Sequence, residues 1–168
     1  MVRTGRLAVA AFLLFLVQVT VVHRFSLGPL HPDLLCALAA FLALEADARG
    51  ALWGAFALGL LMDLGSVGRP GTAALALVPA SACLLALRGG LVRETAWTDL
   101  LLAFLYVLAW GLVLAAGVWL EQSGARFDEL AARALGQATF TTALAPLLFG
   151  AFSKAGLVRK RSTAPDIP

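Results

Sequence analysis

Long apolar stretches alternate with short polar ones along this chain, and this pattern predicts helices that cross a membrane. Six runs consist almost entirely of apolar residues, and they lie at 7–22, 34–44, 51–62, 73–87, 100–120 and 134–152. A helix needs roughly 20 residues to span a bilayer core about 30 Å thick. The run at 100–120 meets that length alone. The pattern predicts an all-α integral membrane protein with six transmembrane helices.

The second and third runs are each too short to span a bilayer, so the positions where their helices begin and end matter. Pro32 suits the first position of the second helix, where the missing N–H of proline does no harm. The third helix can continue through Asp63 to Gly65, since glycine commonly follows the end of a helix. These extensions favour two separate helices. Merging the two runs into one kinked helix would leave five crossings.

The positions of the basic residues decide between six crossings and five. Cytoplasmic loops of membrane proteins carry an excess of Arg and Lys. Six crossings place nine of the 13 basic residues inside, whereas five crossings leave only five there. The nine are Arg3, Arg6, Arg49, Arg88, Arg93, Lys154, Arg159, Lys160 and Arg161. We therefore predict a six-helix transmembrane domain at 1–153 with both termini cytoplasmic, followed by a basic, disordered cytoplasmic tail at 154–168.

The stretch at 126–135 precedes the sixth run and has apolar residues at helical spacing. Such a stretch is typical of a helix that lies flat on the membrane surface. It is equally typical of the first turns of the sixth helix, and the sequence favours neither interpretation.

The overall composition agrees with a chain surrounded by lipid. Hydrophobic residues make up 61% of the chain and charged residues 14%, with a mean hydropathy of +0.89. Soluble domains carry about 25% charged residues, so an ordinary soluble domain is excluded. The net charge of +3 is small, and no basic run is interleaved with aromatic residues. We expect the lipid bilayer, and no nucleic acid, among the partners.

Titratable residues are scattered and form no catalytic pattern. His23, His31 and Asp33 share a predicted outer loop, but no second pair of ligands accompanies them to complete a metal site. We interpret them as residues of a solvated loop. The segment around Asp63 lacks the further aspartates with which a lipid-headgroup transferase holds metal ions. The sequence predicts a protein that is not an enzyme and has no cofactor or metal.

A stripe of glycines in the third run indicates close helix packing. Gly50 and Gly54 form a GxxxG motif, and Gly59 follows one and a quarter turns later. Small residues of this kind let the backbones of two membrane helices approach each other. The partner of this face is either another helix of the same chain or a second protein.

Asp63 ends the third run and is the ionisable residue most worth attention. An ionisable side chain at a membrane helix is a candidate for function. A helix C-terminus carries partial negative charge and disfavours a carboxylate, so some donor has to compensate for it. The available donors are Arg69, the N–H groups of the loop at 65–71, or a group of a partner protein.

Several motifs in the first half of the chain are similar to those of one known family. They are Pro-Asp-Leu-Leu at 32–35, the glycines at 50 and 54, the block Gly-Leu-Leu-Met-Asp-Leu at 59–64, and Gly68, Gly71 and Ala-Ala-Leu at 73–75. With the chain length, the six-run layout and the basic C-terminus, these motifs resemble the rod-shape-determining protein MreD family of the bacterial inner membrane.

The resemblance implies both a fold and a function. The fold of that family is a compact bundle similar to the substrate-binding subunits of vitamin transporters. The function is a non-enzymatic scaffold of cell-wall elongation, which binds the bitopic protein MreC and acts with MreB filaments and peptidoglycan synthases. The resemblance also points to residues. The partner or loop-ordering candidates are Asp63, Arg69, Gly59, Gly68 and Gly71, and the helix-packing candidates are Gly50, Gly54 and Pro32.

The similar transporter subunits raise an alternative, a subunit that binds a small solute. Such a protein needs several polar side chains that converge on a pocket. The polar residues within the predicted helices are few, and we expect most of them to satisfy backbone groups. They are Gln18, Thr20, Ser81, Gln137, Thr139, Thr141 and Thr142. The sequence therefore favours the scaffold.

Overall fold

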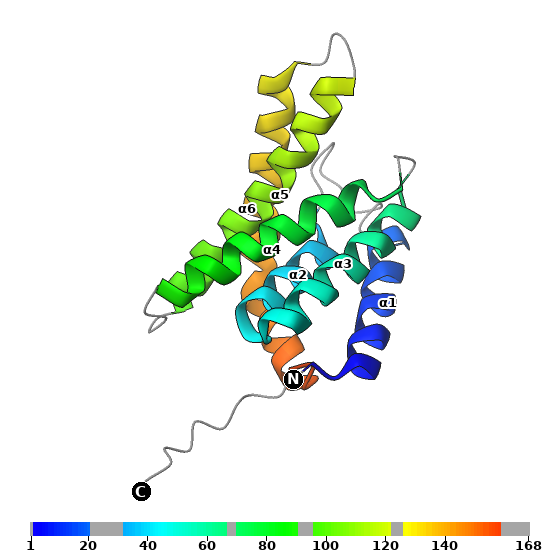
Figure 1. Ribbon diagram of the computed structural model, residues 1–168, viewed down its shortest axis with the longest axis vertical. Coiled ribbons are helices and arrows are strands. Elements are labelled where there is room, and N and C mark those ends of the chain that lie inside the picture. The colour runs from blue at the N-terminus through cyan, green and yellow to red at the C-terminus, as the bar shows by residue number, and fades with distance from the viewer. Residues whose placement is uncertain (1, 21–31, 67–69, 91–95, 122–125, 159–168) are drawn as a thin grey trace, which may run out of the picture.

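The fold is a bundle of six helices, seen here in a computed structural model that describes residues 2–20, 32–66, 70–90, 96–121 and 126–158. The helices are α1 (Thr4–Thr20), α2 (Leu34–Glu45), α3 (Ala48–Leu64), α4 (Thr72–Gly90), α5 (Ala96–Glu121) and α6 (Phe127–Lys154) (Figure 1). The predicted all-helical fold with six helices is confirmed. Most helices are longer than the apolar runs, since polar residues next to each run also belong to the helix.

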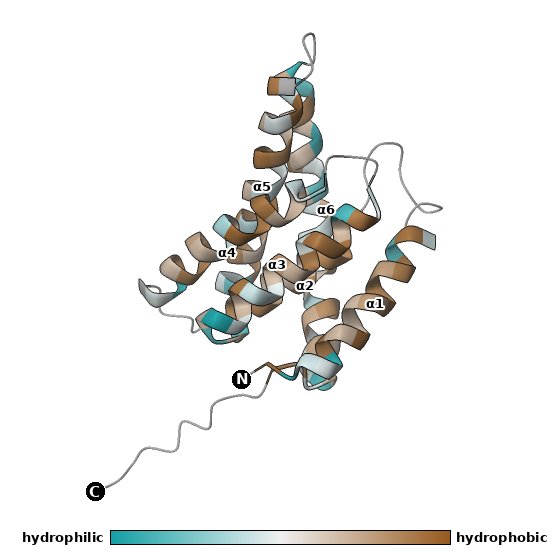
Figure 2. Ribbon diagram, turned by 45° about the vertical axis from the view of Figure 1, so that its right-hand side comes forward, coloured by the Kyte–Doolittle hydropathy of each residue, from teal (hydrophilic) through white to brown (hydrophobic). Residues whose placement is uncertain are grey.

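Three of the helices are long and apolar enough to cross a membrane, namely α4, α5 and α6. The helices α1 and α2 are apolar but shorter. Figure 2 shows hydrophobic residues along the outer faces of the helices, with hydrophilic residues gathered near helix ends. This distribution suits a protein with lipid around it. Six crossings stay a prediction.

The short helix α2 is the centre of the bundle. It contacts each of the other five helices, and every residue from Leu34 to Leu44 is buried. A helix that is apolar on all sides has to be buried in this way, and the run at 34–44 is such a helix. The core of the protein is therefore built around α2.

The start of α2 differs from the sequence-based prediction. The helix begins at Leu34, and Asp33 is its N-cap, accepting a hydrogen bond of 2.9 Å from Cys36 N. Pro32 is buried but precedes the cap, so the prediction of Pro32 at the first helical position is wrong. The first backbone N–H groups of a helix have no partner within it, and the carboxylate of Asp33 accepts one of them as the N-cap.

The C-terminal end of α2 is held by α4. Arg88 Nη1 donates hydrogen bonds to the carbonyl oxygens of Ala43 and Leu44, at 2.7 and 3.0 Å. The last carbonyls of a helix have no partner within the helix, and a cation there also balances the helix dipole. The guanidinium therefore fixes the last turn of α4 against the last turn of α2.

The glycine stripe of α3 faces other parts of this chain. A Cβ atom at Gly59 would lie 2.3 Å from Ala74 Cα and 2.6 Å from Ala74 N, so α3 and α4 touch there through their backbones. A Cβ at Gly50 would meet the Val2 side chain at 2.6 Å, and one at Gly54 would meet Leu42 at 2.7 Å. Of these three glycines, only Gly59 lies directly against the backbone of another helix.

The long helices α5 and α6 form an antiparallel pair that projects beyond the other four (Figure 1). With 26 and 28 residues, they are about 40 Å long at 1.5 Å per residue. The stretch at 126–135 is the start of α6, which runs without a break from Phe127. Its ambiguity is resolved in favour of the first turns of the sixth helix. We call the projecting ends of α5 and α6, residues 117–121 and 126–135, the arm.

The two ends of the described chain lie side by side. Val2 and Val158 form an isolated antiparallel bridge, and Arg3 N donates to Leu157 O at 3.0 Å. Arg6 Nη1 also donates to Ala155 O at 3.2 Å. The first residues of the predicted tail, 155–158, are therefore packed against the start of the chain, and the rest of that tail lies outside the described residues.

Candidate functional site

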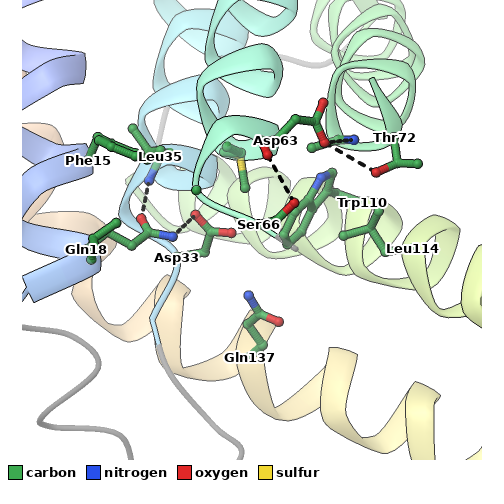
Figure 3. Close-up of a pocket in the computed structure, with 14 residues that line it drawn as sticks. Phe15, Gln18, Asp33, Leu35, Asp63, Ser66, Thr72, Trp110, Leu114 and Gln137 are labelled. Atoms are coloured by element: carbon green, nitrogen blue, oxygen red, sulfur yellow. Dashed lines mark hydrogen bonds between the residues drawn. The ribbon is translucent and has the colours of Figure 1, made fainter. Parts of the chain in front are cut away.

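A pocket of about 560 Å³ opens where α1 and α3 end and where α2 and α4 begin. The middle of α5 and of α6 closes its far side (Figure 3). Its lining combines apolar side chains such as Phe15, Met62 and Leu114 with two carboxylates and two glutamines. A cavity of this size and mixed lining is typical of ligand sites, which are mostly apolar with a few placed polar groups.

Asp63 lies on the pocket wall and caps α4 from the end of α3. The residue is 8% exposed. Its carboxylate accepts hydrogen bonds from Gly71 N at 2.9 Å, Ala73 N at 3.0 Å, Ala74 N at 3.4 Å and Thr72 Oγ1 at 3.3 Å. The N-terminus of a helix offers free N–H groups and partial positive charge. The hydrogen bonds from the first turn of α4 thus compensate for the partial negative charge that the C-terminal end of α3 places near this carboxylate.

The conformation of the residue before α4 completes this cap. Gly71 has a φ of +96°, which glycine adopts without strain, and its N–H points to Asp63. From the sequence, we expected N–H groups of the 65–71 loop as donors, and Gly71 is one of them. The other backbone donors belong to α4 itself. Gly68 and Arg69, both predicted site residues, lie outside the described residues.

Asp33 occupies the neighbouring wall, and its predicted place in a solvated loop is wrong. It is only 2% exposed. Its carboxylate accepts from Gln18 Nε2 at 3.2 Å and from Cys36 N, and its own N–H donates to Thr141 Oγ1 at 3.0 Å. A burial this deep follows from the cap on α2, the central helix. The motif Asp-Leu-Leu before an apolar run carried that N-cap signal in the sequence.

Gln18 joins α1 to this cap. Its Oε1 accepts hydrogen bonds from Leu34 N at 3.0 Å and Leu35 N at 3.2 Å, while its Nε2 donates to Asp33. These two N–H groups are in the first turn of α2 and have no partner inside that helix. The contacts of Gln18 agree with the expectation that polar residues in the helices satisfy backbone groups.

The other expected polar residues differ in what they contact, and Thr141 accepts the Asp33 N–H described above. Thr20 and Thr139 donate to the carbonyls of Leu16 and Leu135, one turn earlier in their own helices. Ser81 shares a buried hydrogen bond of 2.9 Å with Tyr106. Thr142 Oγ1 is buried and has no hydrogen-bond partner among the described residues. Only Gln137 points to the pocket without serving the backbone (Figure 3).

The pocket wall formed by α5 and α6 differs from the wall on which Asp33 and Asp63 cap the starts of α2 and α4. Trp110 is 5% exposed, and its Nε1 is buried with no hydrogen-bond partner in the described part of the chain. No hydrogen bond joins Gln137 to the other residues drawn in Figure 3. Trp110 was not among the residues expected from the sequence, because an apolar run gives no sign of which tryptophan faces a cavity.

Comparison of the chain with family models, curated proteins and solved structures gives no match.

Proposed function

We propose that this protein is a non-enzymatic scaffold of the bacterial inner membrane, with both termini in the cytoplasm. In this proposal it binds MreC and helps to couple MreB filaments to peptidoglycan synthesis in the rod-shape complex. The resemblance of the motifs at 32–75 to those of the MreD family is the basis for this function. The paired ends of the described chain support the topology, because an even number of crossings returns the chain to the side on which it began.

The observation that carries this proposal is the arm. Helices of about 40 Å exceed a bilayer core of about 30 Å, so the tip of the α5–α6 pair extends past the lipid. The tip bears an exposed charged cluster, in which Arg126 lies 2.5 Å from Asp128 and 3.3 Å from Glu129. Beside it, Trp119 and Leu120 are exposed at the end of the apolar span Trp97–Leu120. An exposed apolar surface where a span meets a charged cluster is a place where a single-pass partner in the same membrane can bind.

The arrangement of buried polar groups supports a structural role. The carboxylates of Asp33 and Asp63 both accept backbone N–H groups at helix starts. Both carboxylates hold helices together, and the four hydrogen bonds to Asp63 leave it few lone pairs for proton transfer. A scaffold needs such a fixed frame, whereas a hydrolytic enzyme needs a base or nucleophile that reaches its substrate.

Co-purification from native membranes in a gentle detergent tests the scaffold. We expect a single-pass periplasmic protein of the MreC type to accompany the wild type. Leu120→Ala should lower its recovery several-fold, because this side chain is 76% exposed on the arm. The matched control is Leu147→Ala, at a side chain 74% exposed on the same helix pair but away from the arm. Recovery of no such partner, or equal recovery with both variants, would contradict the proposal.

A second candidate function is a solute-binding subunit of a transporter, and the pocket favours it. The pocket holds more convergent polar groups than the sequence led us to expect, namely Gln18, Asp33, Asp63, Thr72 and Gln137. Such a subunit docks on an energising module. The same co-purification separates the two functions, since this one predicts recovery of a pair of ATPases in place of a single-pass protein.

A further inference from the structure

The bundle has two sides of different length. The helices α5 and α6 have 26 and 28 residues, whereas α1 and α3 have 17 residues each. At 1.5 Å per residue, α5 and α6 are about 40 Å long and α1 and α3 about 25 Å long. In the described part of the chain, neither α1 nor α3 packs directly against α5 or α6, and α2 and α4 pack between the two pairs. We call α1 and α3 the short side and α5 and α6 the long side.

The two sides are level at the end of the bundle that holds the chain termini. Arg3 N donates to Leu157 O at 3.0 Å, and Arg6 Nη1 donates to Ala155 O at 3.2 Å. These hydrogen bonds hold the start of α1 beside the end of α6. The difference in length therefore appears at the opposite end, where the arm projects (Figure 1).

The pocket shows how far the long side continues past the short side. Its lining joins the last turns of α1 and α3 to Trp110 and Leu114 in the middle of α5. The exposed Trp119 follows Leu114 by five residues and Trp110 by nine. Measured along α5, the short side thus ends about 8–14 Å before Trp119.

Two exposed tryptophans mark where α5 meets the surfaces of a bilayer. Tryptophan is enriched at both membrane–water interfaces. Trp97 and Trp119 are exposed near the two ends of α5 and lie 22 residues apart, which is about 33 Å. That distance matches a hydrocarbon core of about 30 Å. The long side therefore spans a bilayer of full thickness, and the short side is about 5 Å too short for it.

The polar groups at the end of the short side cannot make up this difference. The side chains of Gln18 and Asp63 are held by hydrogen bonds to the starts of α2 and α4, so they cannot extend toward a more distant membrane surface. Covering such groups with lipid tails is costly. Tilting the bundle does not help, because it changes the depth of both sides together. A helix that is too short for its bilayer is also accommodated by local thinning of the lipid.

We propose that α1 and α3 bind a thinned patch of bilayer, whose outer surface bends down toward the pocket, while α5 and α6 stay in bilayer of full thickness. The lipid-facing surface of this patch is apolar, with Phe12, Leu13, Phe56 and Leu60 exposed on the two helices. This inference rests on the membrane location in the proposed function and goes beyond the scaffold role.

Spin labels at two matched positions test the proposal on the full-length protein in dioleoyl-phosphatidylcholine vesicles. Val17→Cys and Val113→Cys place a nitroxide on α1 and α5, at side chains that are 40% and 50% exposed. Each position directly precedes a residue that lines the pocket, Gln18 or Leu114, so both lie near the same level of the bundle. Both variants carry Cys83→Ala, whereas Cys36 is fully buried and stays. Collision rates with oxygen and with a water-soluble nickel chelate give the depth of each label.

We expect the label at Val17 to lie about 5 Å closer to the water than the label at Val113, as the difference between 30 and 25 Å requires. In dimyristoleoyl-phosphatidylcholine, whose shorter chains make a thinner bilayer, this difference should disappear. Equal depths in the dioleoyl lipid, or an unchanged difference in the shorter lipid, would overturn the proposal.

The same data separate this inference from the proposed function. If the chelate reaches both labels freely and oxygen shows no enrichment at either, the protein is not in the lipid, and the membrane location fails together with the thinned patch. If both labels lie in lipid at equal depth, only the thinned patch fails. Binding of a single-pass partner is measured separately and does not depend on either depth.

Discussion

At the scale of single residues, Asp63 connects two helices through one carboxylate. It accepts three backbone N–H groups and one hydroxyl from the residues that begin α4. Two explanations for Asp63 were open, an internal tether and a contact with a partner. These contacts favour the tether, because the donors all belong to this chain.

Asp63→Asn should therefore lower stability and leave partner binding intact. The amide keeps the shape but loses the charge that strengthens its hydrogen bonds, and its NH₂ group faces N–H donors. We expect a loss of about 1–3 kcal/mol, read as a lower melting temperature in detergent. Recovery of the partner per folded molecule should not change. For the melting temperature alone, Asp128→Asn is the control for charge removal, because this carboxylate is exposed and should contribute little to stability. An unchanged melting temperature in Asp63→Asn would show that the cap contributes nothing.

Gly59 gives a second prediction at this scale. A methyl group there meets the backbone of Ala74, which cannot rotate away as a side chain can. Gly59→Ala should force α3 and α4 apart and destabilise the protein by about 1–3 kcal/mol. Gly117→Ala on α5 meets nothing within 4 Å and should be neutral or slightly stabilising. Thermal melts of the two variants make the comparison, and equal stabilities would contradict the close approach.

At the scale of helices, α2 depends on caps from other elements at both of its ends. Arg88→Met keeps much of the apolar stem of this side chain and removes its donors to Ala43 and Leu44. We expect a loss of about 1–3 kcal/mol and faster amide hydrogen exchange in the last turn of α2. Hydrogen-exchange mass spectrometry measures this. Faster exchange spread evenly over the bundle, without a focus on α2, would be the contrary result.

Much at this scale was predictable from the sequence, and the rest depended on distant residues. The apolar runs located all six helices. The run at 34–44 was predicted only as a short membrane helix, and its burial on every side became clear from the structure. Helix ends were less predictable, because α3 starts at an Asp47 cap and α6 includes polar turns from Phe127 onward. Pro79 and Pro146 lie inside helices that continue past them.

The candidate site was predictable only where its signal is local. Asp63 stands out as an ionisable residue in an apolar block, and Gly71 belongs to the loop expected to supply donors. Asp33 was misplaced because its burial depends on Thr141, a residue 108 positions further along the chain. Trp110 is one of four tryptophans, and nothing near it in the sequence marks its position on a pocket wall.

At the scale of the whole molecule, the prediction is a topology. Both described ends, with Arg3, Arg6 and Lys154, lie at one end of the bundle, and the arm projects from the other. A variant without native cysteines, labelled with a membrane-impermeant maleimide, should react in intact spheroplasts at Glu129→Cys. Lys154→Cys should react only after permeabilisation. Labelling of both positions from the outside, or of Lys154→Cys alone, would contradict a topology with the arm outside and both ends in the cytoplasm.

The proposed function requires that this bundle binds a single-pass partner as a membrane scaffold. The most direct measurement is the affinity of the purified protein, reconstituted in a lipid nanodisc, for purified full-length MreC. We expect saturable binding that Leu120→Ala weakens several-fold and Leu147→Ala leaves unchanged. No binding of MreC, together with tight binding of a pair of transporter ATPases to the same nanodiscs, would contradict it.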